Sequence, residues 1–266
     1  MTLHDLTRNT FKALHHELGH DRQHDTRPLW QRRLSAQSPF CRALVGCGYL
    51  TEQQMQRAAQ RYRLGMSRDG GVIFWQIDQH DTIRDGKIMY YGADCHRDHH
   101  RHPTWVNYLL KRAGMLLDDF QTDHCLFGLH LLADSLPAAA APAVCVVESE
   151  KTAVIMSEVE PRCLWLATGG KTELSVAKLM PLAGRRVIVF PDTDTTGDTY
   201  RLWYDVAREA SDVMGHPVTV SSILELQATA AQKAAKIDIV DLLFPSPAAA
   251  VPPLGAAVPQ PSETVK

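Results

Sequence analysis

The chain has 266 residues, enough for one large domain or two of modest size. Its 28 basic and 30 acidic residues give a net charge of −2, so no overall positive field marks it as a nucleic-acid binder. No stretch approaches the roughly 18 apolar residues of a membrane span, and the first residues lack the pattern of a secretory signal. We therefore expect a cytoplasmic protein without membrane contacts, whose six Cys residues, which form no Cys-x-x-Cys pair, are reduced.

Residues 1–27 form a polar segment rich in His and Arg, which we expect to be a flexible N-terminus. The letters from His16 to His20 match the His-Glu-x-x-His motif of zinc proteases. No third ligand is evident in this polar region. We interpret the segment as a solvated amphipathic helix and keep a metalloprotease as the alternative.

Residues 28–136 are predicted to form an α+β domain with a β-hairpin. The stretch Thr51-Glu-Gln-Gln54 has the pattern of a capping box and predicts a helix that runs to about Gly65. Two runs rich in β-branched and aromatic residues, 71–77 and 87–91, flank a polar turn at 78–85 and indicate an antiparallel hairpin. The segment 105–136 is predicted to form one or two helices.

The stretch from Cys95 to His102 is the most polar in the chain. Its potential metal ligands do not have the usual spacing of a zinc site, which leaves zinc as one alternative. Basic and aromatic side chains of this loop and the following segment could instead follow a phosphate backbone and stack on a base. These residues are Arg97, Arg101, Trp105, Lys111 and Arg112. A plain solvated loop is the third interpretation.

Residues 137–142 are an Ala/Pro-rich linker and the best domain boundary in the sequence. Residues 143–244 alternate apolar runs with helical patterns, which predicts a parallel α/β sheet flanked by helices. Residues 245–266 are dominated by Ala and Pro without an apolar period, so we expect a disordered tail.

Two apolar runs in this second domain end on carboxylates. Glu148 follows the run 143–147, while Asp192 and Asp194 follow the run 185–191. Because ligands of open parallel sheets collect at the carboxyl ends of the strands, these three side chains are expected to converge. Oxygen ligands without Cys or His suit Mg²⁺ or Mn²⁺. The pattern therefore predicts metal-assisted phosphoryl transfer or phosphodiester chemistry.

Glycines and a lysine accompany these carboxylates. Gly169 and Gly170 follow a third apolar run, and Gly197 lies just after Asp194; each can make the tight turn that a phosphate or metal site requires. Lys151 starts the helical pattern after Glu148 and can contact phosphate, although an exposed helix lysine is the default interpretation.

In order and residue type, these motifs resemble the toprim domain of bacterial primases, topoisomerases and related nucleases. The local sequence is most similar to the toprim modules of phage and plasmid helicase-primases. The similar stretches are Val147-Glu-Ser-Glu-Lys-Thr-Ala153, Ala167-Thr-Gly-Gly170 and Pro191-Asp-Thr-Asp-Thr-Thr-Gly197. Ser149 stands where that family usually has Gly. The stretch Arg61–Gly65 and the following strand are similar to the segment before toprim in primases. The stretches 74–78, 86–89 and 104–106 are similar to uncharacterised toprim-like proteins of Bacteroidetes mobile elements.

The resemblance implies a toprim-like parallel sheet flanked by helices, preceded by an α+β region. It further implies a primase-like protein that acts on nucleic acid, such as single-stranded DNA, in replication or transfer of a mobile element. Glu148, Asp192 and Asp194 would bind Mg²⁺ or Mn²⁺ and carry out nucleotidyl transfer. The alternatives are a non-catalytic toprim-fold module that binds DNA or a partner, and a metal-dependent toprim nuclease.

Two further expectations concern partners and the end of the domain. The sequence has no Cys-based zinc ribbon and no Walker-type loop, so a separate helicase or zinc-bearing replication protein is the expected partner. The stretch Ile237–Leu243 resembles the ending of helicase-primase toprim modules. We interpret its Asp238 and Asp241 as solvated helix caps, with a supporting role beside the metal as the alternative.

Overall fold

The computed structural model describes residues 38–117, 119–133 and 142–245. The expected flexible N-terminus, its His-Glu-x-x-His letters, nearly all of the Ala/Pro linker and all but the first residue of the expected tail lie outside these ranges. In the part that is described, no helix is both long enough and apolar enough to cross a membrane.

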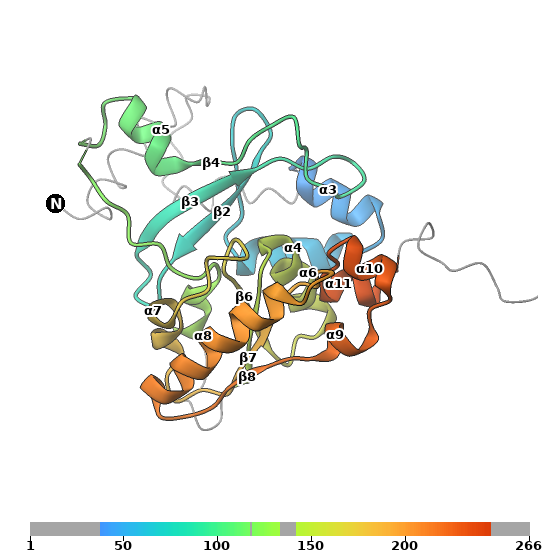
Figure 1. Ribbon diagram of the computed structural model, residues 1–266. Coiled ribbons are helices and arrows are strands. Elements are labelled where there is room, and N and C mark those ends of the chain that lie inside the picture. Colours follow the sequence, from blue (N-terminus) through green and yellow to red (C-terminus); the bar gives the residue numbers. More distant parts are fainter. Residues whose placement is uncertain (1–37, 118, 134–141, 246–266) are drawn as a thin grey trace, which may run out of the picture.

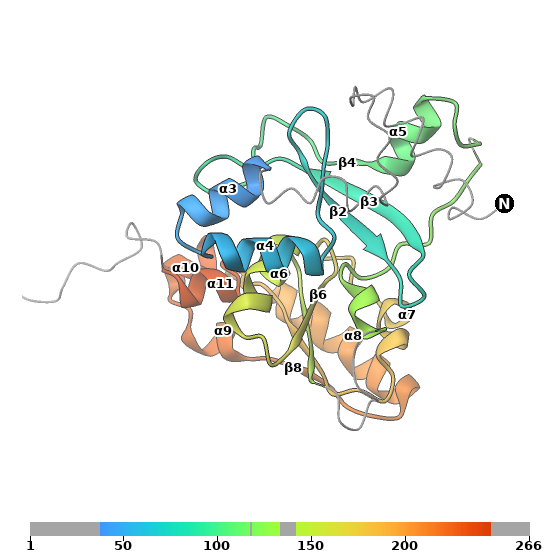
Figure 2. The same cartoon turned by 180° about the vertical axis from the view of Figure 1, so that it is seen from behind.

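Two four-stranded sheets organise the described chain (Figures 1 and 2). The first sheet is antiparallel, and its strand order is β1 (Gly65–Met66), β2 (Val72–Ile77), β3 (Ile83–Met89) and β4 (Thr104–Trp105). The second sheet is parallel, and its order is β6 (Leu164–Ala167), β5 (Val144–Val147), β7 (Val187–Phe190) and β8 (Val218–Val220). The predicted mixed α/β architecture with a parallel sheet is therefore confirmed.

Helices and 3-10 turns connect and cover the strands. In chain order they are α3 (Pro39–Gly46), α4 (Glu52–Arg61), α5 (Val106–Arg112), η1 (Leu129–Leu132), α6 (Glu150–Val159), α7 (Val176–Leu179), η3 (Met180–Leu182), α8 (Asp198–Met214), α9 (Ile223–Gln227), α10 (Ala230–Ala234) and α11 (Ile239–Leu243). The predicted capping box starts α4, with Thr51 accepting from the Gln54 amide and the Gln54 side chain accepting from the Thr51 amide. This reciprocal pair satisfies backbone donors that a helix start would otherwise leave open.

The N-terminal region differs from the prediction in two places. The hairpin of β2 and β3 forms, but β3 begins at Ile83, so the polar turn is shorter than expected. Asp78 makes this possible, because its carboxylate accepts the amides of His80 and Thr82 and closes the turn within a few residues. In segment 105–136, the described residues form only the short helix α5 and the turn η1, joined by irregular chain.

One apolar core spans both sheets. Phe74 of β2 packs edge-to-face on Phe127 at 5.4 Å, and Phe127 stacks on Tyr62 at 4.9 Å. The buried Tyr62 hydroxyl lies within hydrogen-bonding distance of two carbonyls of the parallel half, Trp165 at 2.7 Å and Ala153 at 3.2 Å. The residues on either side of the predicted boundary therefore share an interior.

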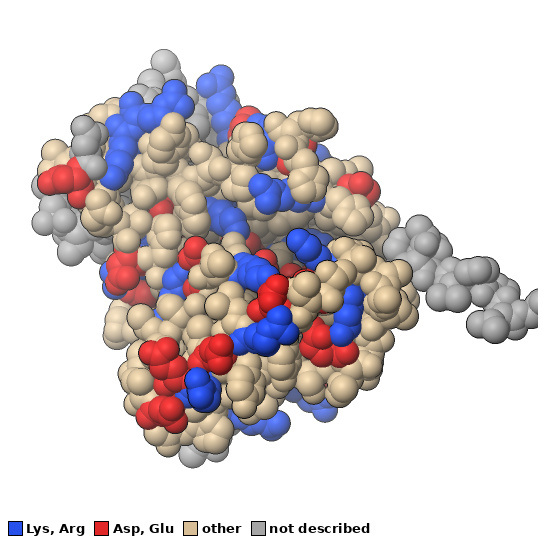
Figure 3. All heavy atoms as spheres, in the orientation of Figure 1, with Lys and Arg blue, Asp and Glu red and all other residues tan. Residues whose placement is uncertain are grey.

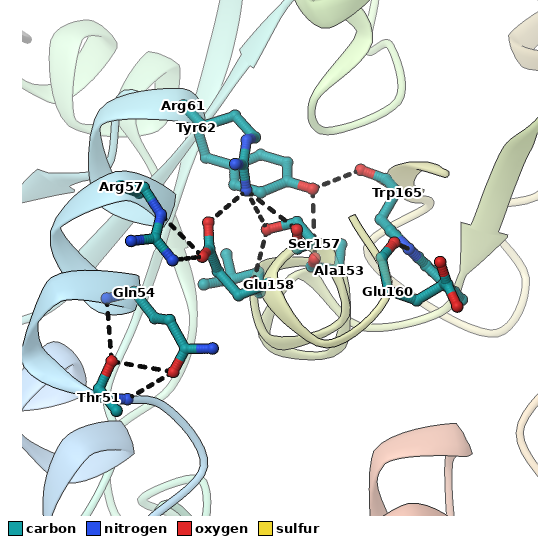
Figure 4. Close-up of polar contacts among 11 residues, drawn as sticks. Thr51, Gln54, Arg57, Arg61, Tyr62, Ala153, Ser157, Glu158, Glu160 and Trp165 are labelled. Atoms are coloured by element: carbon teal, nitrogen blue, oxygen red, sulfur yellow. Dashed lines mark hydrogen bonds and ion pairs between the residues drawn. The ribbon is translucent and has the colours of Figure 1, made fainter. Parts of the chain in front are cut away.

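Charged side chains close the same junction between α4 and α6 (Figure 4). The Glu158 carboxylate accepts from Arg57 at 2.6 Å and from Arg61 at 2.8 Å. Only 3% of the Glu158 side chain is exposed, so both arginines neutralise a carboxylate that has left water. The junction thus combines apolar packing with a nearly buried carboxylate that is paired with two partly exposed arginines.

Candidate active site at the carboxyl edge of the parallel sheet

The register of the parallel strands brings the predicted site residues to one edge. Val147, the last residue of β5, lies opposite Ala167 of β6 and Phe190 of β7. The chain crosses β5 between these two neighbours, running from β6 on one side to β7 on the other. Such a change of direction is the switch point at which open α/β sheets bind ligands. Glu148 and Asp192 directly follow the two strands that meet there.

Asp192 is the most strongly perturbed carboxyl at this edge. Burial raises its pKa well above the ordinary value of 3.8, and the negative charges of Asp238, Glu148 and Asp241 raise it further. The Lys151 ammonium opposes these effects without cancelling them. Four carboxyl groups therefore interact electrostatically at the edge, and their mutual repulsion favours anything that removes negative charge, a proton or a cation.

Glu148 shares this environment but has basic neighbours. Burial raises its pKa, while the Lys171 charge, a hydrogen bond from the Lys171 amide and the Lys87 charge lower it in part. The net pKa remains above the ordinary value of 4.5. Glu148 and Asp192 are thus brought together as the sequence predicted.

Asp194, the third predicted ligand, lies in a different environment. Its Oδ1 accepts from the amides of Thr196 and Asp198 at 3.0 and 2.9 Å and from the Thr196 hydroxyl. Its Oδ2 accepts the amide and hydroxyl of Thr199 at 2.8 and 2.6 Å, and lies 3.2 Å from Lys171 Nζ. Burial alone would raise the pKa of Asp194, but these hydrogen bonds outweigh it and hold the pKa far below its usual range. This carboxylate holds the first turn of α8, and its oxygens are already occupied.

Asp238 and Asp241 join the site from the far end of the domain. They form the capping box of α11, and Asp238 also accepts a short hydrogen bond from the Thr152 hydroxyl of α6. The expected cap is therefore present, but Asp238 is only 6% exposed and is not solvated. The Asp-x-x-Asp pattern signals the cap, whereas only the fold places it beside Asp192.

Lys87 is a site residue that the sequence did not reveal. It belongs to β3 of the antiparallel sheet, yet its Nζ lies 2.6 Å from the Gly169 carbonyl and 3.1 Å from Glu150 Oε1. Both side chains are largely buried, with 12% and 3% exposure. Within the Gly-Lys-Ile-Met strand no local pattern distinguishes this lysine from an exposed one. Its role depends on the packing of one sheet against the other.

The predicted glycines lie in turns near the acidic edge, and Lys151 places a positive charge beside its carboxyl groups. Gly169 has a φ of +88°, and a Cβ there would approach Glu150 Oε1 to 3.0 Å. Gly197 has a φ of +70° and precedes α8, next to the Asp194 hydrogen bonds. Gly170 donates its amide to the Thr168 hydroxyl at 3.4 Å. Lys151 lies in the first turn of α6 and faces the acidic edge, where its charge lowers the pKa of Asp192 and Asp241.

Several of the predicted nucleic-acid contacts have partners within the chain. Arg101 pairs with Asp69 and lies 3.4 Å over the Tyr90 ring. Trp105 stacks on His124 at 4.3 Å, and His124 in turn lies 2.9 Å from Asp85. These side chains are already occupied by neighbours within the chain.

The remaining predicted contacts divide between two places. Arg112 lies 5.8 Å from the Tyr108 ring, and Lys111 precedes it on α5. Arg97 is exposed, and its backbone forms an isolated antiparallel β-bridge with Tyr91. Burial and the Glu150 charge raise the pKa of Tyr91, and the Arg97 charge lowers it in part. Arg97 therefore lies near Tyr91, a residue that is also close enough to Glu150 to be affected by its charge.

The molecular surface is hollowed between its two halves. Figure 3 shows Lys and Arg side chains on the rims of this hollow and carboxylates within it. Among the described residues, no group of three or more His, Cys, Asp or Glu side chains is arranged to hold a metal ion. The edge therefore offers a pair of available carboxylates, Glu148 and Asp192, with lysines around them.

Comparison with known proteins gives a family but no function. No curated protein matches the chain. A family model described as a domain of unknown function, DUF6371, matches residues 38–193, which include the antiparallel sheet, Lys87, Glu148 and Asp192. Because this match covers more than half of the sequence, the chain belongs to the DUF6371 family.

Proposed function

We propose that this chain is a primase-like, toprim-type protein that acts on nucleic acid by Mg²⁺- or Mn²⁺-dependent phosphoryl transfer. The observation that carries the proposal is the convergence of Glu148 and Asp192 at the switch point of the parallel sheet, where carboxyl groups raise one another's pKa. The order of motifs along strands β5, β6 and β7, which resembles toprim, supports the same assignment.

The available residues fit a divalent cation of this kind. Mg²⁺ is commonly held by one or two carboxylates, with waters and substrate phosphates completing the shell. Glu148 and Asp192 would hold it, and the bound charge would relieve the repulsion that now raises the pKa of Asp192. Asp194, which the resemblance assigns to the metal, would instead fix the loop that carries Asp192.

The chain's own groups then divide the chemistry. The cation supplies charge neutralisation and alignment of phosphate oxygens when it is bound. As an alternative to binding the cation, Glu148 is placed to take a proton from an attacking hydroxyl, with Asp192 left to hold the metal. Lys151 lies beside the acids and would contact a phosphate. Lys87 would keep the Gly169 turn in place next to the reacting groups.

The proposal is tested by metal binding followed by a nucleotide assay. Wild type, Glu148→Gln and Asp192→Asn are titrated with Mn²⁺ in a calorimeter, then given labelled nucleotides and single-stranded DNA. We expect each variant to lose at least about tenfold in Mn²⁺ affinity, because one of two anionic ligands is gone. Asp205→Asn, an exposed carboxylate on α8, is the matched control and should bind like wild type.

The outcomes separate the primase from its alternatives. Nucleotide incorporation that requires Glu148 supports the primase-like function, whereas metal-dependent cutting of DNA without incorporation supports a toprim nuclease. A wild type that binds DNA but no Mn²⁺ would identify a non-catalytic binding module. That last alternative draws on one observation: Asp194 is fully engaged in the fold, which leaves a pair of carboxylates rather than three.

A further inference from the structure

Two cysteines from distant parts of the N-terminal region lie in contact. Cys47 is the C-cap of α3, is exposed, and donates its thiol to the Ala93 carbonyl at 3.2 Å. Cys95 belongs to the turn that the Gly92 and His96 backbone closes, and it is only 2% exposed. Cys95 is the second residue after Ala93, whose carbonyl Cys47 contacts, and the Cys47 thiol is near enough to raise the pKa of the Cys95 thiol. An accessible sulfur and a buried sulfur therefore meet at one point.

This cysteine pair lies next to the acidic edge. The Lys151 ammonium, which faces Asp192 and Asp241, is also close enough to Cys95 to lower the thiol's pKa. Tyr49 interacts electrostatically with both groups: burial raises its hydroxyl pKa, and the charges of Asp241, Cys95, Cys47 and Asp238 raise it further. His96, the residue after Cys95, lowers the pKa of Asp241. A movement of the turn that carries Cys95 and His96 would therefore change the electrostatic environment of Asp241.

We propose that Cys47 and Cys95 form a reversible disulfide whose formation changes the turn beside the acidic edge. The oxidant is a low-molecular-weight disulfide of the glutathione class. Formation of the disulfide does not depend on the function proposed above, whereas a regulatory role for the disulfide rests on that function.

The reaction balances as two thiol–disulfide exchanges. The Cys47 thiolate attacks one sulfur of the oxidant, its S–S bond breaks, and the first small thiolate leaves. The Cys95 thiolate then attacks Cys47 Sγ in this mixed disulfide and releases the second. The two protein thiols give up two electrons to the oxidant's S–S bond, and their two protons end on the departing thiols. Burial raises the Cys95 pKa, so the second exchange should accelerate with rising pH.

Oxidation has a defined structural cost at this place. The sulfur atoms must close to about 2 Å, and Cys47 loses the S–H that it donates to the Ala93 carbonyl. The Ala93 carbonyl then loses its thiol donor, while the new S–S bond ties Cys95 and its turn covalently to the end of α3. We expect the turn from Gly92 to His96 to take up a different and more constrained backbone arrangement in the oxidised chain.

A second pair of thiols provides an internal comparison. Cys145 of β5 and Cys163, just before β6, are also close together, since the Cys163 thiol raises the pKa of the Cys145 thiol. Neither is as accessible as Cys47, because Cys145 is buried and Cys163 is half-buried. Because thiol exchange requires access for the incoming oxidant, only the Cys47–Cys95 pair should react readily.

The test equilibrates the full chain in buffers of reduced and oxidised glutathione, blocks the remaining thiols by alkylation and maps disulfides by mass spectrometry. Hydrogen exchange of residues 92–96 and 238–241 is measured on the same samples. We expect a Cys47–Cys95 linkage, the loss of two alkylatable thiols, slower exchange in residues 92–96 and altered exchange in residues 238–241 after oxidation. Cys47→Ser should abolish these changes, whereas Cys163→Ser should retain them.

Two results would overturn the inference. One is a wild type whose Cys47 and Cys95 remain unlinked in all buffers, or in which Cys145 and Cys163 link instead. The other is a linkage that leaves exchange in residues 238–241 unchanged, which would separate the disulfide from the acidic edge. Neither readout needs a metal or a nucleic acid, so a failure of the proposed function would be seen separately, in the Mn²⁺ titration.

Discussion

The two aspartates of the Asp-x-Asp motif have opposite electrostatic environments. Asp192 is surrounded by other carboxyl groups and has a raised pKa, whereas Asp194 is surrounded by amide and hydroxyl donors and has a lowered pKa. The residue between them, Thr193, is buried and donates its amide to the Ile237 carbonyl at 3.0 Å. Two carboxyl groups that are separated by a single residue therefore differ: Asp192 belongs to the acidic edge, whereas Asp194 stabilises the start of α8.

This difference predicts stability changes of opposite sign. Asp192→Asn removes charge repulsion and should raise the melting temperature at neutral pH, by about 2–4 °C for each kcal/mol relieved. Asp194→Asn places an NH₂ group among donors and should cost about 2–4 kcal/mol, since hydrogen bonds to a charged group are lost. Thermal denaturation of both variants, with Asp205→Asn as an unperturbed control, measures the shifts.

The pH dependence distinguishes the two effects further. The folded chain holds the Asp192 proton more tightly than the unfolded chain, so this residue's contribution to stability declines as pH rises from 3.8 toward its raised pKa. The Asp194 contribution is complete above 3.8 and is lost as pH falls below that value. Shifts of the same sign in both variants at neutral pH would contradict these assignments.

At the residue scale, the sequence predicted which residue types occur at the site and at which positions, but not the surroundings of each side chain. The carboxylates, the paired glycines and the capping residues could be named because each follows a local pattern. The occupation of Asp194, the burial of Asp238 and the contact of Lys87 depend on residues that are distant in sequence. No local spacing contains that information.

At the scale of elements, the turn after β6 is fixed by conformation and by a neighbour. Gly169 combines a positive φ with close approach to Glu150, which is itself paired with Lys87. We predict that Gly169→Ala costs about 1–2 kcal/mol for the backbone, plus a further loss because Glu150 must move. Gly215→Ala is the matched control, since its φ is +70° and a Cβ there meets open space.

Chemical denaturation of both glycine variants checks this prediction. The difference between them isolates the contact with Glu150 from backbone strain. Equal losses in the two variants would mean that Glu150 and Lys87 adjust freely, and that they do not hold the turn.

Sequence patterns predicted the elements unevenly, for a physical reason. Helix α4 and the strands β2, β5 and β7 carry strong local signals, a capping box or an apolar run. The region after α5 has apolar residues at helical spacing, but much of it is irregular and packs along other elements. Phe127, for example, forms a β-bridge with Ala167 of β6. Tertiary contacts outweigh weak local preference in such segments.

At the scale of the whole molecule, the junction of α4 and α6 holds the two halves together. Glu158→Gln would remove the charge of a carboxylate whose side chain is only 3% exposed, and would leave the partly exposed Arg57 and Arg61 without their partner (Figure 4). We expect a loss of about 1–3 kcal/mol in the free energy of unfolding, because water screens the arginine ends of the pair. Arg162→Gln breaks an ion pair whose arginine is 86% exposed and should leave the free energy of unfolding nearly unchanged.

Urea denaturation of these two variants measures the difference. Comparable losses at Glu158 and Arg162 would show that the junction pair is as well solvated as a surface pair. A single transition in the wild type, followed by fluorescence and by circular dichroism, is expected for a shared core.

The reach of Lys87 across the junction has a consequence for inheritance. A residue of the antiparallel sheet completes a turn of the parallel sheet, and the Tyr62 hydroxyl meets two carbonyls of that other half. A recombination event that replaced one half with an unrelated sequence would leave Glu150 without its cation and those carbonyls without that partner. The two halves are therefore expected to descend together, as one unit of evolution.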